Sequence, residues 1–325
     1  AVTVGFDDPV LDERPAAAAI ACRLGIRHHA LCFTEDDDWR AFEALAGASD
    51  LPFADPAGIP SWLLFEHCAQ AGFDLVLDGT GADTLLGVMP ARYTRLATEY
   101  MARLPRRVRA VLAQGLKRVE HLRGLAPLFD FDDPEELLIR WKGWTRHEIE
   151  QLVRQPVSLQ QTRFYRIYAS YRRSQHFERY SALLGNLPED RVHQSAACHG
   201  VKVRFPFWDR AVESCVQSLP KHFRYCSGSP KRLLKLILAR RLPSELWDRP
   251  KHGFDFPFQS LMRSRGHALL AEHLDLRCTA DSLGLSPTPI ASHRAAFIGG
   301  DDRSAFRLWG LVVLRAWLVH HAGQL

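Results

Sequence analysis

The stretch DLVLDGTGAD, residues 74 to 83, contains the pattern that decides the fold. Its first five residues are a short apolar run between two aspartates, which is typical of a buried strand. Two glycines follow, and glycine permits the positive φ and the close backbone approach that a sharp turn requires. We therefore predict a strand that ends at Asp78, a tight turn, and the start of a helix.

Spacing alone leaves two interpretations of this turn open. Backbone N–H groups at a helix start favour an anion such as phosphate, and Asp78 and Asp83 could hold magnesium beside it. Alternatively, the turn is a structural strand-to-helix connection in which an aspartate caps the helix.

The sequence before this stretch alternates short strand patterns with helical ones. Residues 1–6 and 28–33 are predicted strands, whereas 12–24, 36–45 and 59–71 are predicted helices. Such alternation is typical of a parallel sheet with crossover helices. Ligands bind at the carboxyl ends of such strands, where Gly5 and Gly79 lie.

After about residue 91 the strand patterns fade and helical ones dominate. The predicted helices cover residues 93–120, 135–153, 160–184, 211–219, 231–241 and 304–321. We therefore predict a nucleotide-binding α/β part over residues 1–90 and a helical part over 91–325.

Composition indicates a folded, soluble protein. The chain has 325 residues, of which 46% are hydrophobic and 24% charged, as in ordinary globular domains. It lacks the run of about 20 apolar residues that a membrane helix needs, so we expect no membrane association. A basic stretch over 103–123 could suggest RNA, but the net charge is only +5 and acids are interspersed. We expect a solvated helix face and no nucleic-acid partner.

The seven cysteines form no C-x-x-C pair, so we expect a reducing, cytoplasmic setting. The sequence starts at Ala1, without methionine and already in a strand pattern, and we expect a piece of a longer polypeptide.

Two lysines are further candidates for a phosphate site. Lys251 lies in the loop RPKHGF (249–254), and Lys231 lies at a predicted helix start after Ser229 and Pro230. A lysine ammonium can neutralise phosphate charge, although a loop lysine is more often only a surface residue. Nucleophile motifs of the Gly-x-Ser-x-Gly type are absent from the sequence.

Several motifs follow one another in a fixed order. They are VTVGFD (2–7), L-G-x-x-H-H (24–29), PFADP (52–56), DGTGADTLLG (78–87), VRFPFWD (203–209) and R-x-K-x-G-F (249–254). This series resembles the synthetase domain of the glutamine-dependent asparagine synthetases and their β-lactam synthetase relatives. The resemblance covers nearly the whole chain.

The resemblance implies a partial Rossmann-like parallel sheet of the adenine nucleotide alpha-hydrolase type. It also implies that ATP adenylates a carboxylate substrate such as aspartate, after which ammonia from a glutaminase domain, absent here, forms the amide. By position, Val4, Asp78, Gly79 and Lys231 would border the nucleotide. Asp83 would hold Mg²⁺, and Lys251 would neutralise the leaving pyrophosphate, so these two are the expected catalytic residues.

The sequence also departs from the family pattern. The family's S-G-G-x-D-S phosphate loop is expected some tens of residues before Ala1 and is missing from this chain, and Asp78, Thr80 and Thr84 replace the usual Ser, acidic residue and Glu. Two alternatives therefore remain: an amide ligase of natural-product biosynthesis, of the β-lactam synthetase or lasso-peptide cyclase type, and a degenerate domain without catalysis.

Overall fold

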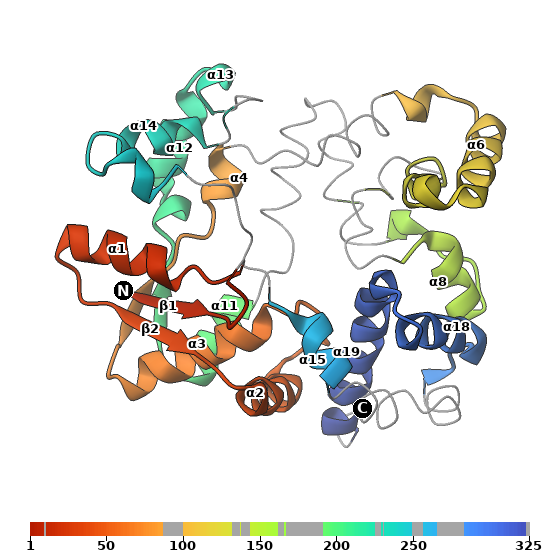
Figure 1. Cartoon of the computed structure of the whole chain (residues 1–325), viewed down its shortest axis with the longest axis horizontal. Coiled ribbons are helices and arrows are strands. Elements are labelled where there is room, and N and C mark those ends of the chain that lie inside the picture. Colours follow the sequence, from red (N-terminus) through yellow and green to blue (C-terminus); the bar gives the residue numbers. More distant parts are fainter. Residues whose placement is uncertain are drawn as a thin grey trace. The chain divides into compact units, whose positions relative to one another are not determined.

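The protein is a mixed α/β structure that is mostly helical and contains small parallel sheets (Figure 1). The computed structural model describes residues 1–9, 11–86, 100–131, 137, 144–161, 166, 191–224, 229, 231–248, 256–264 and 283–322. Two compact units are present. Unit 1 comprises residues 1–88, 187–266 and 313–325, and unit 2 comprises residues 89–186 and 267–312. The predicted division at residue 90 stays a prediction.

Unit 1 begins with a βαβ element, as the sequence pattern predicts. Strand β1 (Val2–Gly5) pairs in parallel with β2 (His29–Cys32), and α1 (Arg14–Leu24) connects them. Helix α1 has a proline in its first turn and ends at Gly25, which has φ +65°. Proline at the start and a left-handed glycine at the end are the usual helix boundaries.

A second parallel pair is formed by β3 (Leu75–Leu77) and β4 (Lys202–Arg204). Strand β3 was predicted, whereas β4, which lies in the part predicted to be mostly helical, was not. Three residues are too few to show a period-two pattern. Strand β4 therefore depends on its pairing with β3, in which Asp78 N–H donates to the Arg204 carbonyl at 2.9 Å.

The two strand pairs share one apolar core with the helices α3 (Gly58–Gln70) and α11 (Arg191–Cys198). The core consists of Phe65, Cys68, Ala196 and Val201, and the packed strand residues are Val2, Val76 and Val203. The neighbours of Val76 point to the other face of β3, where Leu75 is 51% and Leu77 69% exposed. Side chains alternate along a strand, so only one face of β3 is packed.

Several further helices belong to unit 1. Helix α2 begins at Thr34 with a capping box to Asp37. The Trp317 indole of α19 donates to the Ser49 carbonyl at 2.7 Å, which ties the end of the chain to α2. The bounds are α2 (Glu35–Ala48), α4 (Ala82–Leu86), α12 (Arg210–Ser218), α13 (Lys221–Arg224), α14 (Arg232–Leu238) and α15 (Phe258–Ser264). Helix α19 (Ala305–His321) belongs to unit 2 up to residue 312 and to unit 1 from residue 313.

The basic helix of unit 2 is shorter than the helix predicted over 93–120. Helix α6 covers Arg106–Arg118 only, because Pro105, in an extended conformation, precedes it. One of its basic residues is not on a solvated face: Arg109 is 4% exposed and donates to the Phe131 carbonyl at 2.6 Å. Its guanidinium also lies 3.8 Å from the Phe131 ring centroid. Predicted positions 93–99 and almost all of 160–184 lie outside the described residues.

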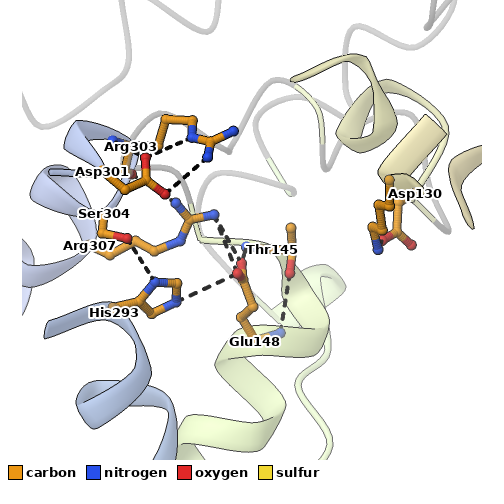
Figure 2. Close-up of polar contacts among 9 residues, drawn as sticks. Asp130, Thr145, Glu148, His293, Asp301, Arg303, Ser304 and Arg307 are labelled. Carbon is orange, nitrogen blue, oxygen red and sulfur yellow. Dashed lines mark hydrogen bonds and ion pairs between the residues drawn. The ribbon is translucent and has the colours of Figure 1, made fainter. Parts of the chain in front are cut away.

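A polar network connects α8 (Arg146–Val153), α18 (Pro287–Ile298) and the first turn of α19 in unit 2 (Figure 2). The Glu148 carboxylate lies 3.3 Å from the Arg307 guanidinium and 3.7 Å from the His293 ring. Figure 2 shows that all three side chains converge on one point. One helix over 135–153 was predicted; α8 begins only after its capping residue Thr145, and residues 135, 136 and 138–143 lie outside the described residues.

Within the described part of the chain, no helix has the length and apolar character needed to cross a membrane.

Candidate functional site

Asp78 shapes the turn at the end of β3. Its carboxylate accepts a hydrogen bond from the Thr80 N–H at 2.7 Å, and its own N–H donates to Arg204 of β4. An aspartate that accepts from the residue two positions on forms an Asx turn, which reverses the chain locally. The side chain of Asp78 is thus part of the structure of the turn.

The second glycine of the turn is required by its surroundings. Gly81 has φ +98°, and a Cβ atom at this position would lie 2.6 Å from the Trp208 indole and 3.2 Å from Phe207. Both conditions favour glycine, since a side chain would be strained and would also collide with the ring. At Gly79, by contrast, a Cβ atom would meet open space.

The structure brings together two of the predicted site residues. Asp83, in the first turn of α4, forms an ion pair with Lys231, with Nζ 2.6 Å from Oδ1. The side chains of Lys231 and Asp83 are 33% and 44% exposed, so the pair is partly exposed, although the Asp83 Oδ1 atom itself is buried. Lys231 precedes α14 and has a left-handed backbone with φ +56°, a conformation that costs about 1 kcal/mol for a residue with a side chain.

The other predicted site residues have separate positions. Val4 lies in β1, where it is 6% exposed and pairs with Leu31 of β2. Asp78 and Gly79 lie in the same turn as Asp83. Lys251 lies outside the described residues.

Trp208 is the residue of this site that sequence reasoning missed. It lies in the short 3-10 turn Pro206–Trp208 that follows β4, and its indole covers Gly81. The motif VRFPFWD was noted, but the partner of its tryptophan was not. The contact between Gly81 and Trp208 leaves no pattern in the local sequence, because only the pairing of β3 with β4 brings the two residues together.

The turn at residues 78–83 offers carboxylates but no enclosed metal site. Among the described residues there is no group of three or more His, Cys, Asp or Glu side chains able to enclose a metal. Magnesium, however, usually keeps several waters and binds through one or two carboxylates together with substrate phosphates. Asp83 lies beside the glycine turn, partly exposed, and is a single carboxylate of the kind that such an ion would use.

Comparison with known proteins relates the chain to one family. The family described as asparagine synthase matches residues 1–319. Asparagine synthetase [glutamine-hydrolyzing] 1 of Bacillus subtilis (strain 168) is 22% identical over 278 residues, which covers 81% of this chain and 43% of the relative. A putative asparagine synthetase [glutamine-hydrolyzing] of Mycobacterium bovis is 25% identical over 344 residues, covering 97% of this chain and 50% of the relative. A protein of Mycobacterium tuberculosis with the same name has the same values.

The chain therefore spans about half the length of the curated relatives that it matches. The family match, in contrast, extends over almost all of its 325 residues. It includes the turn at residues 78–83, Lys231 and the segment after β4. The chain belongs to the asparagine synthase family.

Proposed function

We propose that this chain is the ATP-using part of an amide-forming ligase. A substrate carboxylate oxygen attacks the α-phosphorus of ATP, so that an acyl-adenylate forms and pyrophosphate leaves. An amine, or ammonia, then attacks the acyl carbon, the amide forms, and AMP leaves with the electron pair of the broken C–O bond. A proton from the amine is released to solvent.

The observation that carries this proposal is the Asp83–Lys231 pair beside the Gly79–Gly81 turn. Asp83 would hold the magnesium ion, which neutralises phosphate charge when it is bound. Lys231 supplies a mobile positive charge at the same place. Such fixed charges accelerate reactions in which negative charge develops on a leaving group.

Further roles follow from the family. Val4 and Gly79 would border the adenine nucleotide through backbone groups, and Lys251 would neutralise the leaving pyrophosphate. The strand pairs β1–β2 and β3–β4 would belong to one Rossmann-like sheet, whose carboxyl ends carry the site.

The substrate that we propose is aspartate or a similar small carboxylate. The two relatives are named glutamine-hydrolysing asparagine synthetases, which supports ammonia as the amine and glutamine as its source. Thr80 and Thr84 replace acidic residues of the family pattern, and these replacements favour the alternative of a different acceptor.

Exchange of labelled pyrophosphate into ATP tests the proposal. We expect exchange that depends on the carboxylate substrate, and a loss of at least about a hundredfold in Asp83→Ala and in Lys251→Ala. Asp130→Asn is the control, because Asp130 forms an exposed ion pair with Lys117 at 3.0 Å in unit 2.

Each outcome decides between the candidates. Exchange with aspartate alone supports the asparagine synthetase activity, whereas exchange only with other amino acids or peptides supports a natural-product ligase. Nucleotide binding without exchange for any carboxylate would contradict the proposal and leave a non-catalytic domain.

A further inference from the structure

The ion pair between Lys231 and Asp83 is weak enough for a bound cation to displace the ammonium. Both side chains are partly exposed, at 33% and 44%, and water screens charges at such positions. The attraction in a pair of this kind changes an equilibrium constant by no more than about fivefold. It suffices to place the ammonium on the carboxylate, but a doubly charged cation with phosphate ligands would interact more strongly.

The backbone at Lys231 gives a second, independent reason to examine this residue. Among the described residues, only Lys231 and Arg154 have a positive φ without being glycine. Strained residues of this kind persist where the surrounding structure holds them, and they occur often at ligand sites. Glycine or asparagine would adopt this conformation more easily, but neither would bring a positive charge to Asp83.

We propose that Lys231 is an internal counter-ion for Asp83, which exchanges the ammonium for a divalent cation when a nucleotide binds. In the ligand-free protein, the ammonium occupies the carboxylate oxygen that would contact the cation. After the exchange, the ammonium is released beside the phosphates and interacts with them instead. This inference rests on the proposed function, because it takes Asp83 as the carboxylate that meets magnesium.

The chain offers a matched control for the charge of Lys231. Lys235, one turn further along α14, also forms an ion pair with an aspartate, with Nζ 2.8 Å from Asp248 Oδ1. The exposures of Lys235 and Asp248, 36% and 58%, are comparable to those of the Lys231 pair. Lys231→Asn removes the charge and keeps a residue that tolerates the left-handed backbone, and Lys235→Asn removes an equal charge from the same helix.

Terbium(III) is a suitable probe, since it binds hard oxygen ligands and emits when a nearby tryptophan is excited. Trp208 covers Gly81, two residues before Asp83, so its indole can sensitise an ion at Asp83. Titration of the nucleotide-free chain gives a luminescence midpoint, and Trp208→Phe identifies the part of the signal that comes from this site. Added Mg²⁺ should displace the ion.

We expect Lys231→Asn to lower the terbium midpoint by about fivefold, because the cation no longer competes with the ammonium. Lys235→Asn should leave the midpoint within the error of the wild-type value. Circular dichroism checks folding, and Lys231→Gly, which also relieves the backbone strain, should give the same shift if Lys231→Asn folds poorly.

Two results would overturn the inference, and they differ in their consequence. If Asp83→Asn loses the Trp208-sensitised signal but Lys231→Asn and Lys231→Gly keep the wild-type midpoint, only the counter-ion role fails. If Asp83→Asn retains the wild-type signal, the cation does not bind at Asp83, and the metal role that the proposed function gives to Asp83 fails with it, whereas pyrophosphate exchange still tests the ligase activity.

Discussion

At the scale of single residues, the turn after β3 shows how one position can be restricted twice. Gly81 combines a positive φ of +98° with the Trp208 indole at 2.6 Å from where a Cβ would be. Gly79, two positions earlier, has neither restriction, because its backbone is not left-handed and the space beside it is open. The two glycines of the motif thus serve different purposes.

We predict that Gly81→Ala lowers the free energy of unfolding by about 1–3 kcal/mol, because of backbone strain and overpacking against Trp208. Gly79→Ala should change it by less than about 0.5 kcal/mol. Urea denaturation of both variants measures the difference. Equal losses would show that the Trp208 contact does not restrict residue 81.

At the scale of secondary-structure elements, the start of α8 combines a helix cap with a contact between helices. The Thr145 N–H donates to the Glu148 carboxylate at 2.7 Å, and the Glu148 N–H donates back to the Thr145 hydroxyl at 3.2 Å. The same carboxylate meets Arg307 and His293 (Figure 2). The capping box therefore also joins α8 to α18 and α19.

This cluster has a defined response to pH. Burial raises the pKa of Glu148, but the Thr145 N–H and the Arg307 charge outweigh burial, so that the pKa lies below its ordinary value of 4.5. The pKa of His293 is lowered from its ordinary 6.5, first by burial and then by Arg307, against the opposing effect of Glu148 and Asp301. Because folding lowers both pKa values, the unfolded chain binds more protons than the folded chain around the ordinary pKa of each group.

We predict that stability falls as the pH drops below about 6.5, where His293 of the unfolded chain takes up a proton, and again below about 4.5, where Glu148 does so. In His293→Gln the loss between pH 6.5 and pH 5 should be smaller than in the wild type. Urea midpoints across this range measure it, and His147→Gln, at an exposed histidine of α8, is the control. A wild-type profile in His293→Gln would show that this histidine does not titrate on unfolding.

At the scale of the whole molecule, unit 1 depends on segments that lie far apart in the sequence. Its core joins β1 and β3 from the first hundred residues with α11 and β4 from beyond residue 190. The same strand β3 has a packed face at Val76 and an exposed face at Leu77. Adjacent residues of this strand should therefore respond differently to the same change.

We predict that Val76→Ser destabilises the protein by about 1–2 kcal/mol, because it removes partly buried methyl groups that pack against the core and puts a hydroxyl in their place. Leu77→Ser, at a side chain that is 69% exposed, should change the free energy of unfolding by less than about 0.5 kcal/mol. Thermal and urea unfolding compare the two. A larger effect at Leu77 would mean that the exposed face of β3 is packed in solution.

Local sequence patterns predicted β1, α1, β2, α2, α3 and β3 to within a few residues, because alternation, apolar spacing and glycine turns act over short distances. The boundaries of α6 and α8 were predicted less well, since Pro105 and the capping residue Thr145 ended continuous apolar patterns. Strand β4 was missed because its three residues are extended only when paired with β3.

The sequence by itself determined the family, the order of the elements around residues 1–86, and the glycine turn with its two aspartates. Only the tertiary structure decided that Lys231 meets Asp83 and that Trp208 covers Gly81. The physical reason is distance along the chain. Glycine and helix propensities act between neighbours, whereas these contacts join segments more than a hundred residues apart and form only when strands and helices pack together.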